Sequence, residues 1–159
     1  MSAETRFLEM NLELPAAPKA IGLYRPILVV DGLAYLSGHG PLRPDGTADC
    51  GCLGGVGGNL TVEEGYQAAR QSGLTTLATL RAHLGNLDRV KRLVKTVGMV
   101  RSTADFTEQP AVVNGFSELM REVFGEEAGV AARSAVGVAS LPAGWAVEIE
   151  TIFEVISDS

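Results

Sequence analysis

Arg133 and Glu148 are the two residues of this sequence whose types and spacing could do chemistry. They stand fifteen positions apart (148 − 133 = 15) in two strand-like runs, and Leu141-Pro142-Ala143-Gly144 marks a turn between the runs. A hairpin at this turn would bring a guanidinium, which binds anions through paired hydrogen bonds, into one cleft with a carboxylate, which can move a proton. The same pattern is also typical of a surface hairpin whose charges are solvated.

The stretch from Arg133 to Glu150, RSAVGVASLPAGWAVEIE, resembles the signature of the Rid (reactive intermediate deaminase, or YjgF) superfamily. That signature is Arg-Ser-x-Val-x-Val, then Leu-Pro, then a Val/Ile-Glu-Ile-Glu strand. The resemblance implies that Arg133 grips a substrate carboxylate and that Glu148 is linked to the attacking water. Glu150 falls on the same strand face as Glu148, because strand side chains alternate. It is the second Glu of the motif, and we assign it no chemistry.

Two segments and one single residue, all before Arg133 in the chain, extend the resemblance. Ile21-Gly22-Leu23-Tyr24 matches a family motif whose tyrosine lies near the substrate, and Ser37-Gly38-His39 matches a family Ser-Gly-Gln. The resemblance therefore implies substrate contacts for Tyr24, Ser37 and Gly38. Asn114 corresponds to an asparagine of the deaminating relatives and would help to orient the substrate.

The sequence also departs from the family pattern. His39 replaces the common glutamine, and Ala135 stands where close relatives have Cys. Asn114 follows the Asp105-Phe106 pair by eight residues, a longer gap than in the family, so Thr107 to Pro110 resembles an insertion.

The resemblance implies a hydrolase that converts short-lived enamine or imine intermediates into 2-oxo acids and ammonia, without a metal or an organic cofactor. The departures keep a second hypothesis open, a ligand-binding or regulatory trimer that retains the carboxylate pocket but performs no chemistry. The third hypothesis is the endoribonuclease activity by which this family is often labelled. The acidic charge balance and the lack of clustered aromatic and basic residues argue against a nucleic-acid partner.

Composition excludes several other classes of protein. The chain has 159 residues, of which 46% are hydrophobic, enough for one domain with a sizeable core. Its 13 Lys and Arg against 19 Asp and Glu give a net charge of −6, unfavourable for phosphate backbones and anionic lipid. We find no apolar stretch that could span a bilayer and no apolar signal segment in residues 1–15, so we expect a cytoplasmic protein.

Cys50 and Cys52 lie in the glycine-rich segment DCGCLGGVGGN. A metal site would need more ligands than this pair, and His39 and His83 are the only histidines. A nucleophilic cysteine would need a histidine base, for which only the closeness of His39 in the sequence argues. We expect loop cysteines without function. The segment also lacks the pattern of a phosphate-binding loop.

Apolar periodicity and turn residues predict the order of the elements. Asp31-Gly32 is a strong hairpin signal, and Thr61 with Glu64 forms a capping box. The expected elements are a strand over 7–14, a hairpin of Ile27–Val30 with Leu33–Leu36, a loop over 40–60, a helix from Thr61 to Gly85, a strand over Val90–Val100, a helix from Pro110 to Gly125, and the closing hairpin.

This order predicts a single α+β domain over residues 1–159, with the resemblance clearest over 21–155, in which two helices pack on one face of a mixed sheet. The resemblance implies a chorismate-mutase-like fold and homotrimers with active sites in clefts between subunits. We expect the uncovered face to be small or apolar, which suits contact with another subunit. Its expected residues are Ala34, Leu36, Thr96, Gly98, Ala135 and Gly137.

Overall fold

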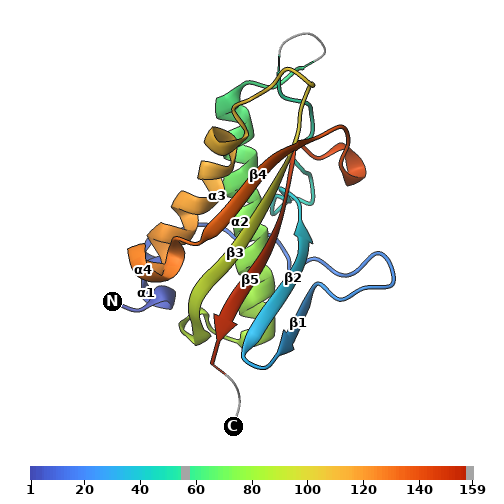
Figure 1. Ribbon diagram of the computed structural model, residues 1–159. Helices are drawn as coiled ribbons and strands as arrows, with labels where there is room; N and C mark the ends of the chain where they lie inside the picture. The colour runs from blue at the N-terminus through green and yellow to red at the C-terminus, as the bar shows by residue number, and fades with distance from the viewer. Residues whose placement is uncertain (55–57, 157–159) are drawn as a thin grey trace.

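One five-stranded sheet and two long helices make up the two layers of the molecule (Figure 1). We describe residues 1–54 and 58–156 in a computed structural model. The sheet has the strand order β1-β2-β5-β3-β4. Its strands are β1 (Ile27–Val30), β2 (Leu33–His39), β3 (Val90–Arg101), β4 (Ala132–Val138) and β5 (Val147–Val155). The helices are α1 (Ala3–Glu9), α2 (Val62–Leu84), α3 (Gln109–Phe124) and α4 (Glu126–Gly129), with 3-10 turns at Leu87–Arg89 and Pro142–Gly144.

The mixed α+β architecture is confirmed, with α2 and α3 on one face of the sheet (Figure 1). The hairpin of β1 and β2 turns at Asp31 and Gly32, whose φ angles are 49° and 77°. Two positive φ angles give a turn whose twist matches that of the strands. None of the described helices is long and apolar enough to cross a bilayer. Residues 55–57 of the expected loop lie outside the described residues.

Both long helices begin and end close to the expected residues. The Thr61 side chain accepts a hydrogen bond from the backbone N–H of Glu64, and the Glu64 carboxylate accepts one from the N–H of Thr61. This capping box satisfies two free donors at the start of α2. At the end of α2, Gly85 adopts the left-handed conformation with φ 81°. Helix α3 has Pro110 in its first turn and ends before Gly125.

The closing hairpin of the sequence-based prediction is wrong, because β3 lies between β4 and β5. Strand β4 pairs parallel with β3, and β5 pairs antiparallel with β3 and with β2. Helix α3 carries the chain from the end of β3 back to its start, and such a crossover makes the next strand parallel. The segment 139–146 then crosses to the opposite side of β3.

The assignment of the sheet faces was also wrong. Ala34, Leu36 and Thr96 are 0%, 2% and 1% exposed, because they lie under the helices. A methyl group on Gly98 would press into Val113 of α3, so this small residue allows the helix to approach. Of the remaining expected residues, Ala135 packs against the core and Gly137 faces Ser102 and Gln109.

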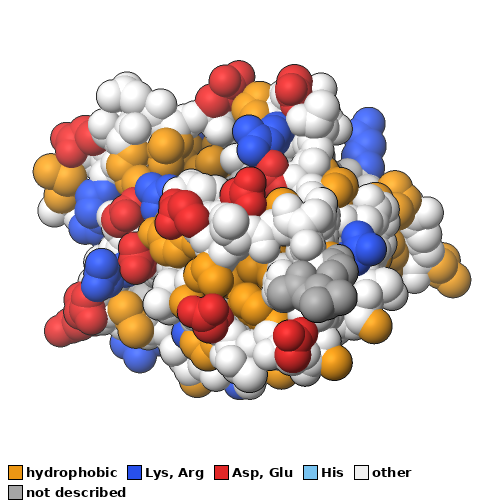
Figure 2. Space-filling model, turned by 90° about the horizontal axis from the view of Figure 1, so that it is seen from above, with side chains coloured by type: hydrophobic (Ala, Val, Ile, Leu, Met, Phe, Trp, Pro, Cys, Tyr) orange, Lys and Arg blue, Asp and Glu red, His pale blue; other side chains and the backbone are white. Residues whose placement is uncertain are grey.

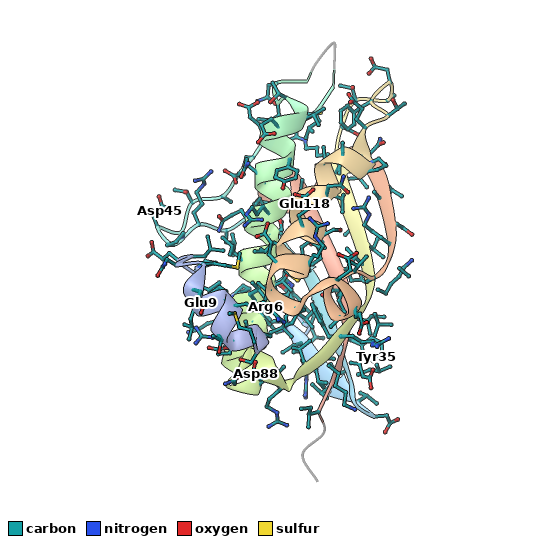
Figure 3. The ribbon with its side chains drawn as sticks, turned by 90° about the vertical axis from the view of Figure 1, so that its left-hand side faces the viewer. Arg6, Glu9, Tyr35, Asp45, Asp88 and Glu118 are labelled. Carbon is teal, nitrogen blue, oxygen red and sulfur yellow. The ribbon has the colours of Figure 1, made fainter. Side chains whose placement is uncertain are left out.

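The face that no described helix covers carries larger apolar side chains. Tyr35 lies on the side of the sheet away from the helices, as the side view in Figure 3 shows. Leu28, which pairs with Tyr35, and Val136 on β4 are 44% and 45% exposed. An open apolar sheet face of this kind is typical of a contact surface.

The first element is a helix and not the expected strand over 7–14. Ser2 caps α1 by accepting a hydrogen bond from the N–H of Thr5. Phe7 is buried, and the guanidinium of Arg81 on α2 lies 5.4 Å from the centre of its ring. The Glu4 carboxylate pairs with Arg81 as well. Contacts with distant parts of the chain therefore decide this element, and α1 packs against the end of the helical layer (Figure 3).

Candidate functional site

Arg133 points from the edge strand β4 to the helix-covered side of the sheet. It pairs with Thr96 of β3, which is buried under the helices. Its Nη1 donates to Oδ1 of Asn114 at 2.8 Å and to Oγ of Ser117 at 3.1 Å, and its Nη2 donates to the carbonyl of Pro110 at 3.3 Å. All three acceptors belong to α3, so this helix fixes the orientation of the guanidinium.

The Arg133 guanidinium retains donors for a ligand. Of its five N–H groups, three are used, so two have no acceptor among the described residues. No ion pair within residues 1–54 and 58–156 includes Arg133. Burial lowers the pKa of the Arg133 guanidinium, because the charged form loses hydration. A carboxylate ligand could supply both missing acceptors through two parallel hydrogen bonds.

A cleft of about 350 Å³ opens beside Arg133, between α3 and the start of β4. Asn114, Ser117 and Arg121 line it from the helix. Glu118 also lines the cleft, but its carboxylate accepts a hydrogen bond of 2.6 Å from the Tyr66 hydroxyl. We call Arg133 with Asn114 and Ser117 the arginine half-site.

Glu148 points to the opposite, uncovered side of the sheet, where β5 lies between β2 and β3. It pairs with Met99 of β3. On the β2 side the register shifts by one residue between Leu36 and His39, which places a bulge at Ser37 and Gly38. A methyl group on Gly38 would overlap the Glu148 carboxylate, so only glycine leaves room for it. We call Glu148 and Gly38, together with Ser37 of β2 and Tyr24 of the segment before β1, the glutamate half-site.

Two causes raise the pKa of Glu148. Partial burial is the larger, and the negative charge of Glu150 on the same strand face adds to it. No residue of the described chain donates a hydrogen bond to the Glu148 carboxylate that would oppose this shift. A carboxyl group whose pKa is moved towards neutrality is suited to exchange protons with a reacting water.

Tyr24, Ser37 and Gly38 meet at one cavity of about 210 Å³. It lies at the edge of the sheet, under the segment that connects α1 to β1 and reaches out beyond β1 and β2 in Figure 1. The Ser37 hydroxyl donates to the carbonyl of Arg25 at 2.7 Å, so it holds this segment in place. The sequence-based prediction thus named residues that come together, although Ser37 has a protein partner already.

Sequence reasoning missed Ser117 and Trp145. Ser117 lies three residues after Asn114 on α3, and i, i+3 neighbours share a helix face, which could have indicated it. Trp145 lines the 210 Å³ cavity, and its ring lies over Gly40, where a methyl group would overlap it. It stands between the turn and the Glu strand, where the family signature gave no reason to single it out.

His39, the departure from the family glutamine, is a buried structural residue. Its Nδ1 lies 2.6 Å from the carbonyl oxygen of Ser37 and its Nε2 lies 2.8 Å from Oγ1 of Thr79. A carbonyl can only accept, so Nδ1 carries the proton and Nε2 accepts from the threonine hydroxyl. Burial lowers the pKa of His39, which favours this neutral form. The residue joins β2 to α2.

Within one chain, Arg133 and Glu148 do not share a cleft. They lie on opposite faces of the sheet, on strands that β3 separates. Asn114 is brought to Arg133, and Gly38 is brought to Glu148. A site that uses both charged groups therefore needs more than one copy of the chain.

The thiols of Cys50 and Cys52 make no hydrogen bond to a residue of either half-site. The Cys50 thiol lies 3.5 Å from the carbonyl of Ala143, and the Cys52 thiol lies 3.8 Å from that of Leu53. Both are free cysteines. Within the described part of the chain, no group of three or more His, Cys, Asp or Glu side chains is arranged to hold a metal ion.

The layered α+β fold, with an Arg-Ser strand at one sheet edge and a Glu-x-Glu strand in the sheet, defines a YjgF-like domain of the chorismate-mutase type. The sequence pattern of the family described as "YjgF/chorismate mutase-like, putative endoribonuclease" matches residues 4–145. The chain belongs to this family, the YjgF/Rid superfamily.

Similar proteins come from distant organisms. Protein TCP17 of Trypanosoma cruzi is 44% identical over 146 residues, which cover 91% of this chain and 89% of that protein. The crystal structure of Atu1372 from Agrobacterium tumefaciens, a protein of unknown function, is 36% identical with a TM-score of 0.84, covering 97% of this chain and 94% of the other. RidA from an Antarctic Psychrobacter is 27% identical with a TM-score of 0.60, covering 87% and 94%.

Proposed function

We propose that this protein is a hydrolytic deaminase that converts reactive enamine and imine intermediates into 2-oxo acids and ammonia. The observation that carries the proposal is the half-buried Arg133, which α3 holds in place while two of its N–H groups remain free beside an open cleft. This arrangement supports binding of the carboxylate that a 2-imino acid carries next to its C=N bond.

Glu148 would act on the water. An enamine such as 2-aminoacrylate first tautomerises to the imine. The oxygen of water then bonds to the C=N carbon, Glu148 takes a proton from that water, and the nitrogen gains a proton. Collapse of the resulting carbinolamine breaks the C–N bond and releases ammonia and the 2-oxo acid. For this role the Glu148 carboxylate must lie within about 3 Å of the attacking water, or reach it through one bridging water.

The active site would form between two copies of the chain in a homotrimer. Arg133 and Glu148 lie on opposite faces of one sheet, and a neighbour whose uncovered face approaches the α3–β4 edge could bring the second group close. The exposed apolar side chains of Leu28, Tyr35 and Val136 support such a contact. Light scattering should give about three times the 16.7 kDa mass of one chain. A mass near one chain would remove this arrangement.

The test of function is ammonia release from freshly generated 2-aminoacrylate, with and without the protein. We expect the protein to accelerate hydrolysis, and we expect pyruvate, as the stable product, to bind at Arg133. Binding of pyruvate without any acceleration would instead indicate the ligand-binding or regulatory trimer.

The endoribonuclease hypothesis finds little support in the surface charge. At the end of the molecule shown in Figure 2, acidic and basic side chains are interspersed among apolar ones. A strand of RNA is typically held by a basic groove with aromatic platforms. We therefore expect neither the wild type nor Arg133→Ala to degrade RNA. Degradation that is lost in Arg133→Ala would favour the nuclease.

A further inference from the structure

The 210 Å³ cavity beside the glutamate half-site has a wall made largely of aromatic and apolar groups. It is formed by Tyr24 and Pro26 from the connecting segment, Gly38 and His39 from β2, and Trp145 from the turn before β5. An apolar cavity of about 150 Å³ can hold a benzene ring. The cavity, which we call the Trp145 cavity, therefore has room for a side chain of the size of that of leucine or phenylalanine.

Three polar side chains in this wall, those of Ser37, His39 and Thr75, already have partners within the protein. Both ring nitrogens of His39 are hydrogen-bonded, and the Ser37 hydroxyl donates to the Arg25 carbonyl. The Thr75 hydroxyl lies 3.1 Å from the Gln71 carbonyl. A polar ligand group would leave its hydrogen bonds with water and find few new partners here, whereas an apolar group has no hydrogen bonds to lose. Lys19, the charged residue in the lining, is exposed at the rim.

The cavity and the proposed catalytic carboxylate share Gly38 as a neighbour, although Glu148 does not line the cavity. Gly38 lines the cavity, and the same residue lies against the Glu148 carboxylate. A substrate whose C=N carbon lies near Glu148 could therefore extend its side chain past Gly38 into the cavity. The Trp145 ring is held over Gly40, which fixes one wall.

We propose that the Trp145 cavity receives the substrate's side chain, and that this protein acts preferentially on 2-imino acids with bulky apolar side chains. This inference rests on the deaminase function proposed above and adds the substrate class to it. Trp145 is then a residue that determines specificity, because it contacts the side chain and not the reacting carbon.

The chain contains one tryptophan, so emission from selective tryptophan excitation comes from Trp145 in the wall of this cavity. We would titrate the protein with pyruvate and with 4-methyl-2-oxopentanoate, the 2-oxo acid with the leucine side chain. Neither has an aromatic ring whose absorption obscures the emission. We expect the branched acid to bind about tenfold more tightly or better and to change the Trp145 emission, while pyruvate binds without that change.

Kinetics give the second measurement. Imines released from leucine and from alanine by an amino-acid oxidase should be hydrolysed with kcat/KM values that differ about tenfold or more in favour of leucine. Trp145→Ala should remove most of this preference, because it should lower kcat/KM for the leucine-derived imine much more than for the alanine-derived imine. Trp145→Phe, which keeps an aromatic wall, should retain part of the preference. Lys19→Ala, at the rim, should retain all of it.

Three outcomes would count against the inference. Equal binding of the two acids without a change in Trp145 emission overturns it and leaves the deaminase function standing. Loss of the preference in Lys19→Ala but not in Trp145→Ala overturns it as well, because charge would then select the substrate. Failure of both acids to bind, together with no acceleration of any imine, removes the deaminase function and this inference with it.

Discussion

The arginine half-site and the glutamate half-site are built in opposite ways. Around Arg133, three acceptors on α3 compensate the charge that burial disfavours, and the group is fixed beside an open cleft. Around Glu148, no described residue donates a hydrogen bond, and both burial and Glu150 disfavour the charge. The first environment keeps a cation oriented for binding. The second makes a carboxylate ready to take up and release a proton.

The two half-sites also differ in what supports them. Two side chains and one backbone carbonyl of α3 orient Arg133, so its position depends on α3 packing against β4. The position of Glu148 depends on the absence of a side chain at Gly38, in the bulge of β2. Neither half-site contains what the other supplies, and the faces of the sheet keep them apart in one chain. We therefore expect mutation to change ligand binding and proton transfer separately.

Removal of the base should have the largest effect. We expect Glu148→Gln to slow imine hydrolysis by about a hundredfold or more, the usual cost of losing a general base. The dissociation constant for a 2-oxo acid should change little, because Arg133 is untouched. The measurement is coupled ammonia release alongside calorimetric binding. Full activity in Glu148→Gln, with weaker binding in Arg133→Ala, would mean that the pocket is a receptor.

Removal of the anion-binding group should come next. Arg133→Ala removes a charge-assisted contact worth about 1.5–3 kcal/mol, so turnover should fall by roughly one to two decades and 2-oxo acid binding should weaken with it. Arg133→Lys should recover only part of the turnover and of the binding, since an ammonium cannot replace the forked guanidinium. Arg121→Ala is the matched control, because Arg121 lines the same cleft. A larger loss in Arg121→Ala would move the carboxylate site away from Arg133.

Mixing the two impaired variants tests whether the half-sites come from different chains. In a ring of three, each mixed assembly has one interface where an intact Arg133 meets an intact Glu148. Random assortment of equal amounts of Arg133→Ala and Glu148→Gln chains should therefore restore about a quarter of the wild-type activity. The measurement is ammonia release after the two variants have been unfolded together and refolded. If activity is not recovered, while wild-type chains regain it after the same treatment, both groups act within one chain.

A smaller effect should follow from filling the space beside Glu148. Gly38→Ala would displace the carboxylate, and we expect turnover to fall about tenfold with little change in 2-oxo acid binding. Gly22→Ala is the control, because a methyl group there makes an ordinary contact of 3.6 Å with the Tyr24 ring. If Gly38→Ala weakens binding as much as it slows turnover, the half-sites are not separable.

Much of the fold could be predicted because its signals are local. Asp31-Gly32 gave the first hairpin through its turn chemistry, and Thr61 with Glu64 gave the start of α2. The start of α3 followed from Pro110, since proline suits the first helical turn. In each case the residues that carry the signal also make the contacts that form the element.

The sequence-based predictions were wrong where contacts between distant parts of the chain decide the structure. Alternation in a strand defines two sets of side chains but does not say which set the helices cover. Thr96 and Gly98 were assigned to the open face because they are small, yet small residues are what let α3 approach. The Leu141–Gly144 turn suggested a hairpin, although the crossover through α3 places β4 on the far side of β3. The family motif named both charged residues of the candidate site, but their places on opposite faces follow from the registers of β4 and β5 against β3, which the sequence does not show.

The last prediction concerns Glu150 and the pH dependence. A base works when deprotonated, so turnover should fall as pH falls through the pKa of Glu148 in the folded protein. Because burial and Glu150 raise that pKa, the acidic limb should lie above the ordinary range for Glu. Glu150→Gln removes the smaller cause and should shift the limb towards lower pH, with the maximum rate little changed.

The same shift predicts the sign of an effect on stability. A carboxyl whose pKa is raised by folding stabilises the protein in its protonated form, and this contribution is lost as pH rises through the raised value. Glu148→Gln should therefore raise the midpoint of thermal unfolding at neutral pH and have less effect in acid. The measurements are the pH profile of kcat and thermal unfolding at both pH values. A limb that stays in place in Glu150→Gln, while moving with salt, would show that more distant charges and not Glu150 set the pKa of Glu148.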